Sequence, residues 1–261
     1  MSGHAHETNG VGTFCRAFAS YARDNGVPFF CAYGGRESRF SETGSVRELQ
    51  LRRGPFAFEV DSDLVCDPLM TRHRDLAVPR LREFQPDLIH ITGPGDVSIL
   101  GLWAASLVGA PAMAAWHTNI HEYAYRRLQA ALSFLPRPIR ERVSTGAGNG
   151  TLLAAMRFYR IAHFVAAANQ EMVDLLGRET GRPAFLMAHG VDPRLFAPAR
   201  RRRTDSHFQI GYVGRLTPEK NVRALVELER NLLAAGERDW LDANLRQIGR
   251  ASCRERVCLA V

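Results

Sequence analysis

The feature that most constrains the fold is a regular alternation of apolar runs and helical segments that begins at residue 71. A helix through 76–84 precedes the apolar run Leu88-Ile89-His90-Ile91, and a helix over 96–108 precedes a second run, 111–116. Continuous apolar runs of this length are typical of strands buried on both faces of a parallel sheet. Strands that alternate with helices form right-handed βαβ units. We therefore expect an α/β protein with a doubly wound parallel sheet, whose ligands bind outside the carboxyl ends of the strands.

The alternation extends to both sides of this segment. Helical periodicity predicts helices over 14–22, 151–160 and 169–177, and β-rich runs predict strands over 28–33, 56–60, 163–167 and 184–187. Residues 34–55 are polar and show no clear period. The glycine-rich stretch 144–150 is expected to be flexible.

Composition and charge exclude several classes of protein. The chain has 261 residues, 46% of them hydrophobic, without a run of about 18 apolar residues or a signal-peptide core, so we expect a cytoplasmic protein whose membrane contact is at most peripheral, at the inner face. Five cysteines without a CxxC pair argue against a disulfide framework and a zinc site. The net charge of +7 is concentrated in the run Arg200–Arg203 and in the last fourteen residues, which argues against a nucleic-acid partner.

A glycine-bearing stretch, Thr8-Asn9-Gly10-Val11-Gly12-Thr13, stands directly before the first predicted helix. An Asn-Gly pair permits positive φ, and the missing side chain at Gly10 would let a ligand touch the backbone. The alternative is an ordinary turn, since the dinucleotide fingerprint GxGxxG is absent. Such a loop normally follows a buried strand, and the few residues before it suggest that a first strand is missing.

A second strand–glycine–helix junction lies near the end of the chain. The apolar run 209–213 ends at Gly214, is followed by Arg215 and Lys220, and opens into a segment with helical spacing from Val222 onward. Positive charge, free backbone N–H groups and close backbone approach are what an oligophosphate needs. A basic surface turn is the alternative interpretation.

Other polar residues follow predicted strands. His117 stands at the carboxyl end of the strand 111–116, where the rule for α/β sheets places chemistry, although a histidine in a buried turn is more often structural. His90 lies inside a strand and is expected to be structural. His121, Glu122 and Tyr123 follow His117 on the next helix and could offer polar groups to the same cleft. Asp61-Ser62-Asp63 could hold a divalent metal against a nucleotide diphosphate or could be a polar loop.

Several of these motifs occur together in one order that resembles glycosyltransferase family 4. The set is Asn9-Gly10-Val11, Pro86-Asp87-Leu88-Ile89-His90, His117-Thr118, His189-Gly190-Val191-Asp192 with Phe196-Ala197-Pro198, and Gly214-Arg215-Leu216-Thr217-Pro218-Glu219-Lys220-Asn221. The resemblance implies a GT-B architecture of two Rossmann-like domains. It also implies a retaining transfer of a hexosyl group from a nucleotide-diphosphate sugar to a lipid or saccharide acceptor, with no metal or other cofactor.

The resemblance also implies roles for single residues. Gly10 would lie beside the donor diphosphate or the acceptor, His117 near the reacting sugar as the catalytic residue, and Arg215 and Lys220 on the diphosphate. A pair of cations suits this task because the leaving group is an oxyanion.

The predicted domain organisation departs from a complete enzyme of this family. We expect an acceptor-side domain over 1–198, a linker over 199–207 and the start of a donor-binding domain over 208–246. The tail, 247–261, resembles the translation of a sequencing adapter rather than native protein. No position matches the acidic motif of the family. The chain is accordingly expected to be a fragment that is poorly soluble and inactive in transfer.

Three alternatives remain from the residues alone. The chain could be another nucleotide-sugar enzyme of the same fold, such as an epimerase. It could be a non-catalytic anion- or lipid-binding module that uses the arginine-rich surface of 137–160, including Arg157 and Arg160. It could also be a metal-dependent transferase that uses Asp61 and Asp63.

Overall fold

The structure is a computed structural model that describes residues 10–61, 64–194, 196–200, 211–215, 221, 223–234, 244–246 and 256–260. The chain divides into two compact units, Met1–Gly190 and Val191–Val261. Each unit is described by itself. Most of the predicted linker, 199–207, lies outside the described residues.

The first unit is built around a parallel sheet. It contains β6 (Ile89–Ile91), β7 (Ala112–Trp116), β8 (Phe164–Ala167) and β9 (Ala184–Leu186), in that spatial order, and every pair of neighbours is parallel. The predicted parallel α/β sheet is thereby confirmed. Because all four strands run parallel, their carboxyl ends meet at one edge of the sheet.

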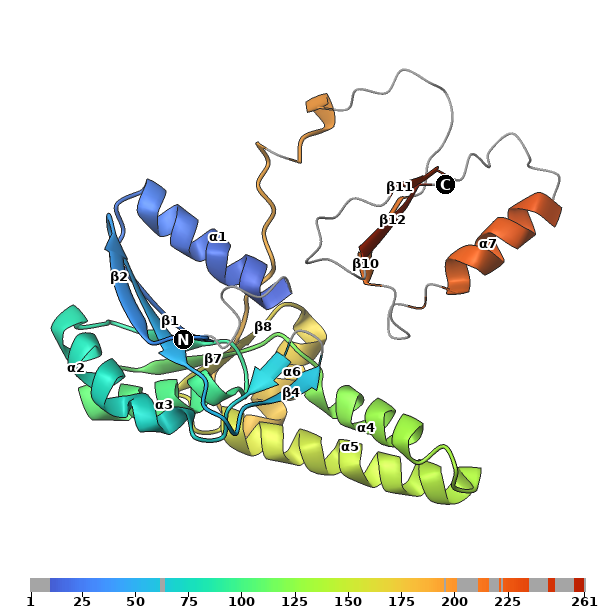
Figure 1. Cartoon of the computed structure of the whole chain (residues 1–261), viewed down its shortest axis with the longest axis horizontal. Helices are drawn as coiled ribbons and strands as arrows, with labels where there is room; N and C mark the ends of the chain where they lie inside the picture. Colours follow the sequence, from blue (N-terminus) through green and yellow to red (C-terminus); the bar gives the residue numbers. More distant parts are fainter. Residues whose placement is uncertain are drawn as a thin grey trace. The chain divides into compact units, whose positions relative to one another are not determined.

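Helices cover both faces of this unit (Figure 1). α2 (Arg74–Phe84), α3 (Asp96–Val108), α5 (Arg137–Tyr159) and α6 (Gln170–Thr180) supply the core beneath the central strands, and α1 (Gly10–Asp24) lies on the opposite side. The core includes Ile91, Ala114, Val165 and Leu176, which are fully buried. α6 begins at an N-cap, since the side chain of Asn169 accepts a hydrogen bond of 2.9 Å from the backbone N–H of Met172.

A second sheet forms around residues 34–55, where the sequence shows no clear period and predicts no strand. β1 (Phe29–Gly35), β2 (Arg39–Thr43) and β3 (Val46–Arg52) pair in the order β1-β3-β2, with β1 and β3 parallel. β3 buries only Val46, Leu49 and Leu51, which are too few apolar positions to stand out from the polar residues between them. A short hairpin of β4 (Phe58–Asp61) and β5 (Leu64–Cys66) and the 3-10 helix η1 (Met70–His73) lead to α2.

The expected flexible stretch 144–150 is instead part of one continuous helix. α5 runs from Arg137 to Tyr159 and packs along α4 (Ile120–Ala131). Ser144 and Gly148 are buried one turn apart, and a Cβ atom on Gly148 would come within 3.4 Å of the backbone oxygen of His121. The glycine therefore serves close packing of the two helices rather than mobility.

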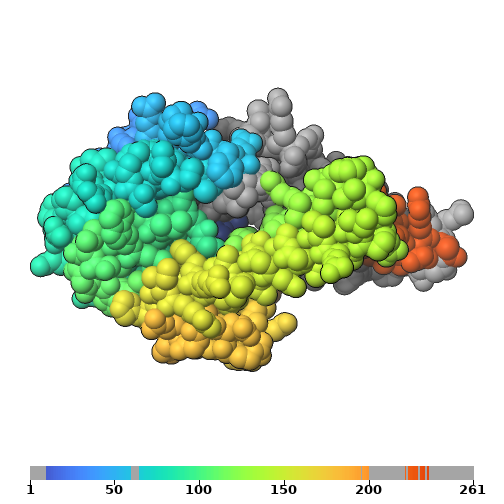
Figure 2. All heavy atoms as spheres, turned by 90° about the horizontal axis from the view of Figure 1, so that it is seen from below, coloured from blue at the N-terminus to red at the C-terminus, as the bar shows by residue number. Residues whose placement is uncertain are grey.

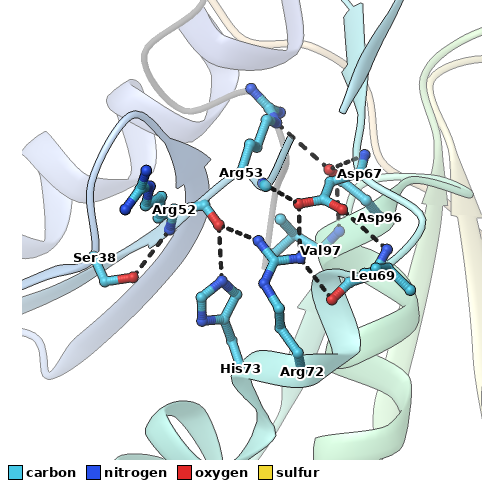
Figure 3. Close-up of polar contacts among 10 residues, drawn as sticks. Ser38, Arg52, Arg53, Asp67, Leu69, Arg72, His73, Asp96 and Val97 are labelled. Carbon is cyan, nitrogen blue, oxygen red and sulfur yellow. Dashed lines mark hydrogen bonds and ion pairs between the residues drawn. The ribbon is translucent and has the colours of Figure 1, made fainter. Parts of the chain in front are cut away.

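Two buried carboxylates join the second sheet to the start of α3 (Figure 3). The Asp67 carboxylate, whose side chain is 0% exposed, accepts hydrogen bonds from the backbone N–H groups of Gly54 (2.6 Å) and Leu69 (3.0 Å) and pairs with Arg72 at 2.8 Å. The Asp96 carboxylate accepts from the backbone N–H of Asp67 at 3.0 Å. Burial raises the pKa of Asp67, but these hydrogen bonds and Arg72 outweigh it and hold the pKa below its usual value.

The second unit contains η2 (Pro198–Arg200), β10 (Gly211–Arg215), α7 (Arg223–Ala234), β11 (Asn244–Arg246) and β12 (Arg256–Ala260). The strand predicted at 209–213 and the helix predicted after it are confirmed as β10 and α7. The strands pair antiparallel in the order β10-β12-β11. Across the described part of the chain, none of the helices combines the length and apolar character that crossing a membrane requires.

We predict that Asp67→Asn lowers the free energy of unfolding by about 3 kcal/mol, because it leaves Arg72 and two backbone N–H groups without a carboxylate. Asp75→Asn is the matched control, since the Asp75 side chain is 85% exposed and its contact with Arg74 should contribute no more than about 0.5 kcal/mol. Urea unfolding of the two variants measures the difference. Equal effects would show that the Asp67 network is not a structural junction.

Candidate active site

An aromatic residue and three histidines meet at the carboxyl edge of the parallel sheet. The ring of Phe14, on α1, lies 4.9 Å from the ring of His117 and 5.5 Å from that of His189, centroid to centroid. The rings of His117 and His189 are 5.5 Å apart, and His90 lies 6.5 Å from His117. His117 directly follows β7 and His189 follows β9 by three residues, so the topology of the sheet brings them together.

His117 is a buried histidine whose ring nitrogens are not used by the described part of the protein. Both of its ring nitrogens are buried, and neither has a hydrogen-bond partner among the described residues. Burial, with a smaller contribution from the nearby His189, lowers the pKa of His117 to about 4. The imidazole is therefore neutral at pH 7, with one nitrogen able to donate a hydrogen bond and the other able to accept one.

A short chain of hydrogen bonds fixes the corner that carries His117. The indole N–H of Trp116 donates to the side-chain oxygen of Asn119 at 2.8 Å, and the Asn119 amide donates to Glu122 at 3.0 Å. Glu122 also pairs with Arg126 at 3.2 Å. Glu122, which the sequence offers as a ligand group, is thus engaged in holding the corner.

The structure also fixes the position of His121, on the first turn of α4. Its ring lies 6.0 Å from that of Trp116, and its Nδ1 atom is buried without a hydrogen-bond partner in the described structure. His90 lies inside β6, as predicted, and burial is the main cause that lowers its pKa to about 3.

Gly10 is the first residue of α1 and is exposed. It is not among the described glycines with positive φ, so the helix does not use the conformational freedom that the Asn-Gly pair permits. A Cβ atom at this position would meet nothing within 4 Å. Among the residues that the structure describes, neither the backbone conformation nor side-chain packing requires glycine at this position.

Several of the remaining candidate residues fall outside the described residues. Arg215 is the last residue of β10, and Lys220 lies outside the described residues. Asp61 ends β4, whereas Ser62 and Asp63 also lie outside the described residues. Among the residues that are described, no group of three or more His, Cys, Asp or Glu side chains is arranged to hold a metal ion.

The family profile for Glycosyltransferase Family 4 matches residues 8–195, which include the whole histidine cluster. The chain belongs to glycosyltransferase family 4. The parallel sheet of the first unit agrees with the Rossmann-like GT-B fold expected for this family, and the predicted transferase class is confirmed.

Two curated relatives have similar sequences. One is a GDP-mannose-dependent alpha-mannosyltransferase of Mycobacterium tuberculosis (strain CDC 1551 / Oshkosh), 30% identical over 160 residues, which are 57% of this chain and 37% of the relative. The other carries the same name in Mycolicibacterium smegmatis (strain ATCC 700084 / mc(2)155), 30% identical over 168 residues, 59% of this chain and 40% of the relative. The match thus spans about two fifths of the length of these relatives.

The sequence alone does not show that Phe14 and His189 lie beside His117. It places Phe14 at the start of a predicted helix and His189 in a family motif without a role. The signal that could have found them is topological, because a helix that starts at the carboxyl edge presents its first turn to the residues that end the neighbouring strands.

The lowered pKa of His117 predicts how stability depends on pH. Below about pH 6.5 the unfolded chain binds a proton at this residue, whereas the folded protein does so only near pH 4. Stability should therefore fall as the pH is lowered from about 6.5 to 4, and His117→Gln should make this fall shallower whatever its effect at pH 7. Urea midpoints at pH 7, 5.5 and 4.5 measure both slopes. Parallel curves for the two proteins would contradict the assignment.

Proposed function

We propose that the whole protein transfers a hexosyl group from a nucleotide-diphosphate sugar to a lipid or saccharide acceptor, with retention of anomeric configuration. The observation that carries the proposal is the neutral His117, which has no hydrogen-bond partner in the described structure and stands at the ligand-binding edge of a family 4 sheet. Because both relatives are named as GDP-mannose-dependent, GDP-mannose is the donor to test first.

His117 would hydrogen-bond the sugar next to the bond that breaks. Its two free ring nitrogens allow it to accept from one hydroxyl and to donate to another, and Phe14 holds the imidazole on one side. A neutral ring suits this place, since positive charge develops on the sugar as the leaving group departs and an imidazolium would oppose it.

Arg215 and Lys220 would bind the diphosphate in the second unit. A guanidinium can bind two phosphate oxygens at once, and an ammonium places a compact charge on one. These cations would stabilise the negative charge that grows on the leaving group. We propose that they do so without a metal or other cofactor.

We propose that the 261-residue chain alone has no measurable transfer activity. The donor would be held by the second unit, whereas the match to the family model ends at residue 195 and the matches to the two relatives span only 37% and 40% of their lengths. Transfer is therefore to be assayed with the complete reading frame of the source gene, and the 261-residue chain serves as the comparison.

A lipid acceptor would bring the protein to a membrane surface. We therefore include peripheral contact with the inner membrane face in the proposal, with the reaction on the cytoplasmic side.

Membership of family 4 favours the transferase over an epimerase of the same fold. Product analysis with and without acceptor separates them, because an epimerase changes the donor sugar in the absence of acceptor.

The first functional prediction concerns turnover. The complete protein should release GDP from GDP-mannose in an acceptor-dependent reaction with an α-linked product, and His117→Ala should lower kcat by about two to three orders of magnitude. Acceptor-dependent GDP release and NMR of the anomeric proton measure both. A β-linked product would contradict retention, and full activity of His117→Ala would contradict the role of the histidine. Robust turnover by the 261-residue chain would contradict its proposed inactivity.

A second prediction separates ligand binding from stability at Gly10. Gly10→Ala should leave the free energy of unfolding unchanged or raise it by about 0.4–1 kcal/mol, because the helical backbone tolerates alanine and the space is open. The same change should weaken donor or acceptor binding by the complete protein, measured by calorimetry. Gly150→Ala is the matched control, since that helical glycine also meets nothing within 4 Å but lies in α5. Equal binding by both variants would contradict a ligand contact at Gly10.

A further inference from the structure

The helical hairpin formed by α4 and α5 extends beyond the body of the first unit (Figures 1 and 2). Its two helices hold each other through side chains on their inner faces. The Tyr125 hydroxyl donates to Glu141 at 2.7 Å, and the Gln129 amide donates to the other oxygen of the same carboxylate at 3.0 Å. We call this hairpin, held together by contacts between its own helices, the arm.

The end of this arm exposes large apolar side chains. Phe134, in the turn between the helices, is 78% exposed, and Ile139 and Val143, one turn apart on α5, are 51% and 44% exposed. Arg142 lies on the same side of α5, because residues three and four apart share a helix face. We call the surface made by Phe134, Ile139, Arg142 and Val143 the hairpin tip.

The arm carries a net positive charge. Residues 120–160 contain seven arginines and two glutamates. Both glutamates are engaged within the arm, Glu122 with Asn119 and Arg126, and Glu141 with Tyr125 and Gln129. The outer surface around the exposed apolar residues is thus positive.

We propose that the hairpin tip docks on an anionic lipid surface. Phe134, Ile139 and Val143 would enter the boundary between headgroups and acyl chains, and Arg142 would meet lipid phosphates. A nucleic acid would not explain aliphatic side chains at the point that projects furthest, and an acidic protein would not require them either. The proposal rests on the proposed function only in that a lipid acceptor gives docking a purpose. Docking itself needs neither donor nor turnover.

The structure favours a different arginine for lipid binding from those that the sequence offers. Arg160, which the sequence offers for this task, uses its guanidinium to donate two hydrogen bonds to the backbone oxygen of Glu179, at 3.1 and 2.7 Å. Arg160 therefore ties α5 to the end of α6. Arg142, at the far end of the arm, is exposed and is the better candidate.

Sedimentation of the 261-residue chain with vesicles tests the proposal without any transfer assay. The chain should bind vesicles of phosphatidylcholine with 30% phosphatidylglycerol, and bind pure phosphatidylcholine much more weakly. Arg142→Glu should weaken binding roughly 25-fold, since about fivefold is expected for each unit of charge near an anionic surface. Phe134→Ser should weaken it by about tenfold or more through the loss of an inserted aromatic ring.

Matched controls come from exposed residues elsewhere in the same unit. Arg23→Glu on α1 repeats the charge reversal, and Phe56→Ser repeats the loss of an exposed ring, Phe56 being 68% exposed. Both controls should bind like the unmodified chain, and circular dichroism should show that all four variants keep the fold.

Loss of binding in the controls to the same degree would overturn the proposal, as would the absence of binding to anionic vesicles. If Phe134→Ser instead turned a dimer into a monomer without changing vesicle binding, the tip would be a contact between copies of the chain and the proposal would fail. Failure of the transfer assay with intact vesicle binding would contradict only the proposed function.

Discussion

The junction of Asp67 and Asp96 is the interaction on which the rest of the first unit depends. Apart from the β4-β5 hairpin, the described strands of this unit form two separate sheets, β1-β3-β2 and β6-β7-β8-β9, and no described ladder pairs a strand of one with a strand of the other. The two sheets are joined by α2 and α3, which bury side chains in the cores of both, by Phe30, which packs against both cores, and by the chain of carboxylate hydrogen bonds that links Gly54, Asp67 and Asp96. Asp96 is also the first residue of α3, where a negative charge is favourable to the helix dipole.

The candidate site spans this junction. The middle of α1 packs on the second sheet, where Ala19 and Ala22 form a small core with Val46. The N-terminal part of the same helix places Phe14 against His117 and His189, which follow strands of the parallel sheet. A rotation between the two sheets would therefore displace Phe14 from the imidazoles. The buried carboxylates thus stabilise the fold and also hold the geometry of the site.

Much of the fold can be read from the sequence because its strongest signals are local. The helix over 96–108 is predicted to the residue, and the strand before His117 follows from its continuous apolar run. The missed elements depend on partners distant in the chain. β3 is a strand because β1 and β2 lie on either side of it, and residues 144–150 are helical because Gly148 fits closely against α4. The position of His117 was predictable from the sheet rule, whereas its contact with Phe14 required knowing where α1 begins.

The helix α4 connects the arm to the candidate site. It therefore sets how the parallel sheet would be oriented if the arm lay on a surface. This helix begins three residues after His117, and its Glu122 is tied through Asn119 to Trp116 at the end of β7. Twelve residues of α-helix extend about 18 Å. A hairpin tip held at a membrane would therefore keep His117 about 18 Å away, measured along α4. The hydrogen bonds of Asn119 at the start of α4 and the Glu141 contacts along the arm resist bending. An acceptor that reaches His117 from the lipid would have to bridge that distance with its own headgroup, and so the length of α4 acts as a physical limit on which acceptors can react.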